Sequence, residues 1–254
     1  MTKVVDTKPL IRWTIGPSSK DGFKCLEKSV SNIKKLYPEC DFIVCHNQLS
    51  GAQKDKIANL DVDLFDQDKH QNSLNHPPQG VNVHWKLYPP RLRYNAHEIC
   101  IDNDIILWKR VPEIDYFLNN NMCLIYQGKN RLYGIYDSNM PQAIRINSGI
   151  YGLPPAFDFG GKINDIQKPW KGRFDEQGLV ATILSENPHF IIPLTSVPIC
   201  EYWMTSDNFK KSLDSFLRNE LCCGLHLVGI NYSKQSHLYS SFIKNLWRSR
   251  IKMI

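Results

Sequence analysis

The hydrophobic positions of the first 65 residues fall into short apolar runs separated by amphipathic stretches. Residues 10–15 are mostly apolar, Gly16 and Pro17 end the run, and the apolar positions that follow up to residue 36 have helical spacing. This pattern predicts a strand followed by a helix. The same order recurs in the next segments, with a strand at residues 41–45, a polar helix at residues 51–59 and a strand at residues 62–65.

The alternation continues after a polar loop that reaches residue 80. Residues 85–94 have helical spacing but contain Pro89 and Pro90, which predicts a helix that is short or broken there. Residues 98–107 form the strongest apolar run and predict one strand. Strands that alternate with helices predict an α/β fold with a largely parallel sheet. The further predicted elements are strands at residues 122–126 and 144–151 and helices at residues 160–166, 175–184, 208–219 and 238–248.

The length and composition are those of one ordinary globular domain. The chain has 254 residues, of which 42% are hydrophobic and 22% are charged. This balance excludes a largely disordered chain and suits a single hydrophobic core. Lys and Arg outnumber Asp and Glu by 31 to 25, which favours an anionic ligand such as a nucleotide without requiring a polyanion such as DNA. We therefore expect no nucleic-acid partner.

Two features bear on the cellular compartment. No apolar stretch approaches the roughly 20 residues that a transmembrane helix needs, and residues 1–10 lack the apolar core of a secretory signal. We therefore expect a cytoplasmic protein. The eight cysteines include no Cys-x-x-Cys pair, so we predict reduced, buried thiols instead of disulfides or a zinc site.

Two aspartates lie two positions apart inside the apolar run 98–107. Asp102 and Asp104 project to the same side of a strand, because side chains alternate along it. Burying two unpaired carboxylates together is costly, so the sequence predicts that they share a divalent cation, Mn²⁺ or Mg²⁺, where the strand leaves the sheet. The alternative is a pair of exposed carboxylates in a turn. Ligands of open α/β sheets bind at the carboxyl ends of strands, which favours the cation.

Four further segments accompany this Asp-x-Asp. They are Trp-Lys-Leu-Tyr-Pro-Pro-Arg-Leu at residues 85–92, Arg-Ile-Asn-Ser-Gly-Ile-Tyr-Gly at residues 145–152, Phe-Asp-Glu-Gln-Gly-Leu at residues 174–179 and Gly-Leu-His-Leu-Val-Gly-Ile-Asn at residues 224–231. The order of the five motifs resembles that of the GT-A glycosyltransferases. The last segment is similar to the His-x-x-Gly of glycosyltransferase family 8, although the Lys-Pro-Trp that often follows is replaced by Asn-Tyr-Ser-Lys at residues 231–234.

The resemblance implies a GT-A fold over residues 1–254, with a mixed but mostly parallel central sheet flanked by helices. Residues 205–254 would be a C-terminal helical extension that contributes a metal ligand. Asp102, Asp104 and His226 are the implied ligands of the cation. The implied contacts to the nucleotide-sugar donor are Trp13, Thr14, Ile15, Lys86, Arg91, Asp102, Asn103, Asn147, Ser148, Gly149, Gly229 and Lys234.

The segment Asp175, Glu176 and Gln177 is implied to act on the acceptor side as the catalytic group. An inverting enzyme needs a carboxylate base there, whereas a retaining enzyme needs polar groups around the anomeric carbon but no base. The resemblance to the family 8 pattern, with Gln177 close to Asp175, favours retention slightly. The alternative for the two acids is a helix start, where the helix dipole favours negative charge.

Structural alternatives exist for the other residues as well. Core packing explains Trp13 equally well, a solvated helix face explains Lys86, Arg91 and Arg93, and a strand with a bulge explains residues 147–149. Histidines such as His226 are commonly packed or surface residues.

The resemblance implies a glycosyltransferase of the kind used in polysaccharide biosynthesis, with a UDP-sugar favoured as donor and a glycan or lipid-linked acceptor. The predicted helix 238–248 interleaves apolar and cationic residues, a pattern that suits peripheral contact with an anionic membrane or docking on the core. Two other functions stay open: a metal-dependent nuclease or phosphohydrolase, and a nucleotide-sugar-binding module without turnover. A nucleotidyltransferase is disfavoured, because the first strand is not followed by a Gly-rich loop with arginine.

Overall fold

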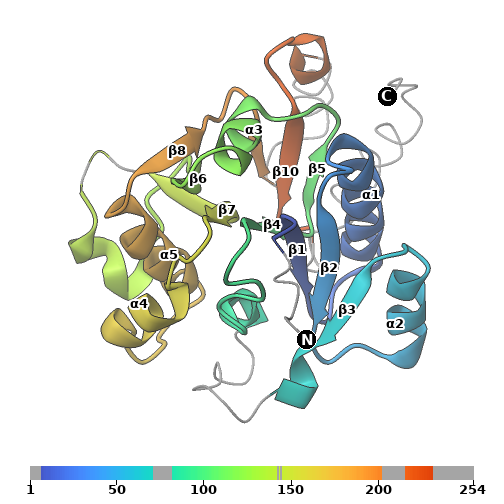
Figure 1. The fold of residues 1–254 in the computed structure, drawn as a ribbon, viewed down its shortest axis with the longest axis horizontal. Helices are drawn as coiled ribbons and strands as arrows, with labels where there is room; N and C mark the ends of the chain where they lie inside the picture. The colour runs from blue at the N-terminus through green and yellow to red at the C-terminus, as the bar shows by residue number, and fades with distance from the viewer. Residues whose placement is uncertain (1–6, 71–81, 142, 144, 202–214, 231–254) are drawn as a thin grey trace.

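The computed structural model describes residues 7–70, 82–141, 143, 145–201 and 215–230. Its centre is a seven-stranded sheet with the strand order β3-β2-β1-β4-β7-β6-β8 (Figure 1). Only β7 runs against its neighbours, β4 and β6, while the other paired strands are parallel. The predicted mixed, mostly parallel sheet is therefore confirmed. The strands are β1 (Leu10–Ile15), β2 (Asp41–His46), β3 (Asp63–Asp66), β4 (Glu98–Asp102), β6 (Cys123–Gln127), β7 (Ile146–Leu153) and β8 (His189–Ile192).

A second, three-stranded sheet has the order β5-β10-β9. It consists of β5 (Ile105–Leu107), β10 (Gly224–Val228) and β9 (Ile199–Glu201). The prediction of one continuous strand at residues 98–107 is therefore wrong, because the chain turns between β4 and β5 and enters the other sheet. Both halves are buried, so their apolar character alone does not reveal the turn.

Helices surround the large sheet, as the sequence predicted. The first begins at Ser19, whose hydroxyl caps it by accepting a hydrogen bond from the Gly22 amide at 3.0 Å. In Figure 1, α4 and α5 lie together beside the β6–β7 half and α1 and α2 lie beside the β1–β3 half. The helices are α1 (Lys20–Leu36), α2 (Gly51–Ala58), α3 (Pro112–Leu118), α4 (Phe159–Ile166) and α5 (Asp175–Ser185), with 3₁₀ helices η1 (Gln67–His70), η2 (Asn82–Leu87) and η3 (Gly134–Asn139).

Nine of the predicted elements are confirmed to within two residues at each end: β1, β2, β3, β6, β7, α1, α2, α4 and α5. The predicted helix 85–94 is reduced to η2, which ends before Pro89. The short elements α3, β8, β9 and β10 were not predicted. Of the predicted helix 208–219, residues 215–218 are described and are helical, whereas the predicted helix 238–248 lies outside the described residues.

The core consists of three apolar clusters. One lies between α1, α3 and the large sheet, one beneath α4 and α5, and one around the small sheet. All eight cysteines are buried and none is in a disulfide, as predicted. No helix among the described residues combines the length and the apolar character that crossing a membrane requires.

Candidate functional site

Asp102, Asp104 and His226 meet where the two sheets join, and we call them the Asp–His trio. The ligand atoms of the trio all lie within 4.8 Å of one another. The Nε2 atom of His226 is 3.3 Å from an oxygen of Asp104 and 3.9 Å from an oxygen of Asp102. A six-coordinate ion with ligands about 2.1 Å away separates neighbouring ligands by about 3 Å and opposite ones by about 4.2 Å. The trio therefore has the spacing and the ligand types of a divalent cation site.

The topology explains why these three residues meet. Asp102 is the last residue of β4 and pairs with Thr14 on β1, so it lies at the carboxyl edge of two parallel strands. Asp104 is the second residue of the turn and directly precedes β5. Strand β5 pairs with β10 so that Ile105 lies opposite His226. The backbone carbonyl of Asp104 also accepts a hydrogen bond from the Leu227 amide at 2.9 Å. The turn between β4 and β5 thus brings both aspartates to the histidine.

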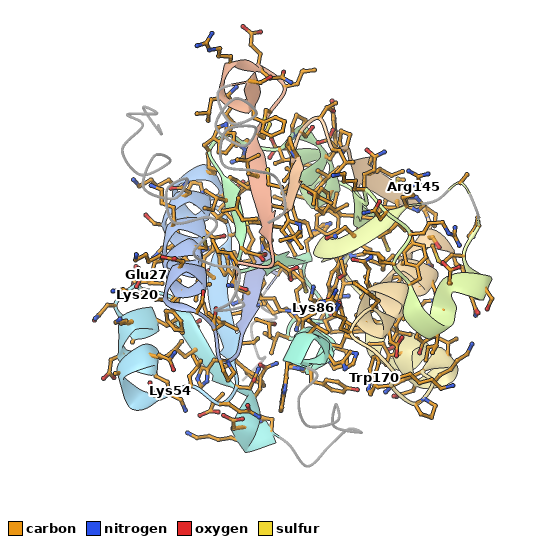
Figure 2. The ribbon with its side chains drawn as sticks, turned by 180° about the vertical axis from the view of Figure 1, so that it is seen from behind. Lys20, Glu27, Lys54, Lys86, Arg145 and Trp170 are labelled. Atoms are coloured by element: carbon orange, nitrogen blue, oxygen red, sulfur yellow. The ribbon has the colours of Figure 1, made fainter. Side chains whose placement is uncertain are left out.

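Lys86 links the Asp–His trio to a further carboxylate, that of Glu176. Its ammonium lies 2.7 Å from an oxygen of Asp102 and 3.4 Å from an oxygen of Glu176. It also donates to the backbone carbonyl of Ser148 at 3.1 Å and to its hydroxyl at 3.3 Å. Burial acts to lower the pKa of Lys86, but Asp102 and Glu176 outweigh it and raise that pKa. Lys86 is therefore a fixed cation. Figure 2 labels it on η2, between the two halves of the fold.

Glu176 lies on the first turn of α5 and is 3% exposed. The Ser148 hydroxyl donates to its other carboxylate oxygen at 3.0 Å. Burial raises the pKa of Glu176 to about 7, although Lys86 opposes the shift. The carboxyl group therefore exchanges a proton near neutral pH, which an ordinary surface glutamate does not.

The neighbours of Glu176 on α5 point elsewhere. The carboxylate of Asp175 accepts backbone hydrogen bonds from Ile135 at 3.0 Å, Lys171 at 2.6 Å and Gly172 at 2.8 Å. The amide of Gln177 donates to the carbonyl of Leu132 at 2.9 Å. Of the three residues predicted for the acceptor side, Glu176 contacts Lys86 at 3.4 Å and Ser148 at 3.0 Å, whereas the polar groups of Asp175 and Gln177 have the backbone partners just described.

The Asn-Ser-Gly segment lies on β7, which faces the trio. The Asn147 side chain accepts a hydrogen bond from the Gly149 amide at 2.7 Å. A Cβ atom added to Gly149 would lie 2.7 Å from the His226 ring and 2.7 Å from the Asn147 side-chain oxygen. Glycine is thus required where β7 approaches the histidine.

Three other residues predicted to contact the nucleotide-sugar donor have hydrogen-bond partners elsewhere in the fold. Trp13 belongs to the core and donates from its ring nitrogen to Ser29 at 3.0 Å. Asn103 is buried and directs its amide to the carbonyl of Gly22 on α1. The Arg91 guanidinium donates to backbone carbonyls, including those of Pro154 at 2.8 Å and Phe157 at 2.9 Å.

The remaining predicted contacts lie at strand ends or beyond the described residues. Thr14 is half-buried beside Asp102, and Ile15 is buried at the end of β1. Gly229 follows β10 with a φ of 90°, a conformation that favours glycine. Lys234 lies outside the described residues.

A second trio, His46, Asp66 and Asp68, lies at the ends of β2 and β3. Here the acids already have partners, since Asp66 pairs with Lys54 at 3.1 Å and Asp68 accepts the Gln48 amide at 2.7 Å.

Sequence reasoning missed a buried ion pair behind the site. Arg12 on β1 lies 3.2 Å from Glu98 on β4, and both side chains are at most 1% exposed. The available signal was a cation inside the first apolar strand and an anion at the start of the apolar run 98–107, because buried charges are paired.

No protein-family model matches the chain, and no curated protein sequence matches it. Solved structures do match, and several of them are glycosyltransferases. The bifunctional glycosyltransferase WbbM, in its apo form, matches with a TM-score of 0.59 and 14% identity, over 91% of this chain and 47% of that chain. This chain therefore spans about half the length of WbbM.

Two further structures match over nearly their whole length. The galactosyltransferase LgtC, solved with donor and acceptor sugar analogs, has a TM-score of 0.53 and 11% identity, over 91% of this chain and 95% of that chain. Mouse xyloside xylosyltransferase 1, in its apo form, has a TM-score of 0.54 and 13% identity, over 89% of this chain and 98% of that chain. The chain thus has the GT-A fold that the sequence predicted.

Proposed function

We propose that this chain is a divalent-metal-dependent glycosyltransferase that moves a sugar from a nucleotide-diphosphate sugar to a glycan or lipid-linked acceptor. The observation that carries the proposal is the meeting of Asp102, Asp104 and His226 at the carboxyl edge of β4, in a fold shared with glycosyltransferases. Following the resemblance in sequence, we favour a UDP-sugar as donor.

The residues of the trio suit Mn²⁺ or Mg²⁺. Carboxylate oxygens bind both ions, and the imidazole favours Mn²⁺. When bound, the cation would offset the charge of the donor diphosphate and of the nucleoside diphosphate that leaves. Lys86 holds one oxygen of Asp102 at 2.7 Å, while the other oxygen faces His226 at 3.9 Å. The lysine therefore orients the aspartate without occupying the oxygen nearest the histidine.

We further propose that the reaction retains the anomeric configuration. A general base must lie within hydrogen-bond reach of the acceptor hydroxyl. Both oxygens of Glu176 instead face partners of the chain itself, Lys86 and Ser148. A carboxyl group with these partners is better suited to orienting Lys86 and Ser148 than to receiving the proton of the acceptor hydroxyl. Determining the anomeric configuration of the product by NMR tests this point, and an inverted product would overturn it.

The experiment that tests the function measures release of nucleoside diphosphate from UDP-, GDP- and dTDP-sugars with Mn²⁺ or Mg²⁺. We expect turnover of one donor and a loss of at least roughly 100-fold in Asp104→Asn, because a catalytic metal stabilises the transition state by several kcal/mol.

Asp66→Asn is the matched control, since it alters an aspartate of the second trio. It should keep wild-type turnover. Cleavage of nucleic acid without turnover of any nucleotide sugar would support a nuclease instead. Binding of a nucleotide sugar without turnover would support the non-catalytic module.

A further inference from the structure

The segment 85–90, which carries Lys86, has backbone carbonyl groups that need partners from outside. It lies beyond both sheets, and its prolines, Pro89 and Pro90, have no N–H group to donate. Buried backbone carbonyls are nearly always hydrogen-bonded. In this segment two buried side chains, Gln67 and Arg12, donate to five carbonyls. Two of the five have a further donor: the Trp85 carbonyl accepts the Tyr88 amide at 3.0 Å, and the Lys86 carbonyl accepts the Tyr151 hydroxyl at 3.5 Å.

Gln67 holds the segment from the side of η1. Its amide nitrogen donates to the carbonyl of Trp85 at 2.7 Å and also to that of Tyr88. Its amide oxygen accepts a hydrogen bond from the Asn47 side chain at 3.1 Å. The contact with Asn47 sets which end of the amide faces the segment, since an amide has one donor end and one acceptor end. Gln67 is 2% exposed.

Arg12 holds the same segment from the side of β1. Its guanidinium donates to the carbonyls of Lys86 at 3.1 Å, Pro89 at 2.8 Å and Pro90 at 3.2 Å. Its partner Glu98 extends this support, because the second carboxylate oxygen of Glu98 accepts the Leu92 and Arg93 amides at 2.8 and 2.9 Å.

These bonds fix the backbone on both sides of Lys86, whose side chain reaches Asp102 at 2.7 Å and Glu176 at 3.4 Å. We propose that Gln67 and Arg12 are positioning residues, which act through the segment 85–90 to hold the Lys86 ammonium between the two carboxylates. The effect on turnover rests on the proposed function, whereas the effect on Lys86 itself does not.

The variant Gln67→Met tests the proposal, because methionine keeps the length of the side chain and removes both donors. Replacing Arg12 would leave Glu98 buried without its partner, and that variant is at risk of not folding. Tyr37→Phe is the matched control. It removes a buried hydrogen bond to the Val111 amide, 2.8 Å long, at the far end of α1.

The first readout is the rate at which an acetylating reagent modifies Lys86 in the full chain, followed by mass spectrometry. The Lys86 side chain is 12% exposed and its ammonium is paired with Asp102, so it should react slowly in the wild type. We expect Gln67→Met to accelerate this reaction by at least about threefold, while Tyr37→Phe leaves it unchanged. Equal rates in the wild type and Gln67→Met would overturn the proposal, whether or not the chain is a glycosyltransferase.

The second readout is a double-mutant cycle on kcat. We expect Gln67→Met to lower kcat by roughly tenfold in the wild-type background and to have little effect in the Lys86→Met background, because the effects of residues that act through one group are not additive. If Gln67 had a purely structural role, Gln67→Met would lower kcat by the same factor in both backgrounds. That result would overturn the proposal. If the wild type turns over no nucleotide sugar, the proposed function fails, and the modification rate still decides the role of Gln67.

Discussion

Glu176 combines deep burial with a lysine partner. Burial raises the pKa of its carboxyl group from an ordinary value of 4.5 to about 7, while Lys86 and the hydroxyl of Ser148 act in the opposite direction. The folded chain therefore holds a proton that the unfolded chain releases between these two pH values. Since the folded state binds more protons in this window, the free energy of unfolding falls as the pH rises from 4.5 to 7.

The variant Glu176→Gln should lack this dependence. Relative to the wild type, its stability should increase with pH across the window, with a slope of up to about 1.4 kcal/mol per pH unit. Urea unfolding at several pH values between 4.5 and 8 measures the slope. Ser148→Ala removes a hydrogen bond that lowers this pKa, so it should move the upper end of the window above pH 7. Parallel stability curves for wild type and Glu176→Gln would contradict the raised pKa.

At the scale of elements, the site depends on a close approach between β7 of the large sheet and β10 of the small one. Gly149 on β7 lies against the ring of His226 on β10, with space for hydrogen but not for a methyl group. The turn between β4 and β5 brings Asp102 and Asp104 to the same place. The position of the imidazole is therefore set by a strand that supplies no metal ligand of its own.

A methyl group at position 149 should displace the histidine. Its Cβ would lie 2.7 Å from His226 Cε1 and 3.1 Å from Nδ1. We expect Gly149→Ala to weaken Mn²⁺ binding by at least roughly tenfold, as changes that misplace a metal ligand do. Titration calorimetry measures the affinity. Gly51→Ala is the control, because no atom lies within 4 Å of a Cβ at that position. Unchanged Mn²⁺ affinity in Gly149→Ala would show that His226 does not depend on this contact.

At the scale of the whole molecule, a cation bound by the Asp–His trio would link the two sheets. Asp102 ends a strand of the seven-stranded sheet, while His226 lies in the three-stranded sheet. The unfolded chain does not keep these residues together, so a cation that binds only the folded state stabilises it by mass action.

Adding Mn²⁺ should therefore raise the Tm. At a concentration 100 times the Kd the gain is about 2.7 kcal/mol, which corresponds to roughly 5 to 10 °C for a chain of this size. Thermal unfolding followed by circular dichroism, with and without EDTA, measures it. The Asp104→Asn variant should show little of the shift, whereas Asp66→Asn should show all of it. The opposite pattern would place the cation at the second trio.

The sequence by itself determined nine of the strands and helices, and it marked Asp102, Asp104 and His226 as candidate metal ligands. Apolar runs of strand length and amphipathic stretches of helix length are local patterns, and each is visible in a window of a few residues. The spacing of the two aspartates likewise marks a charged pair inside an apolar run. These features depend on neighbours along the chain, which is why nine elements were predicted closely.

The tertiary structure decided which side chains meet. Apolar character did not reveal the turn between β4 and β5, because both halves of the run 98–107 are buried, in different sheets. Apolar character also did not show that Glu176 contacts Lys86, whereas Asp175 and Gln177 contact backbone groups of other segments. Successive residues of a helix point about 100° apart, so only the packing of α5 against its neighbours selects the one that enters the site.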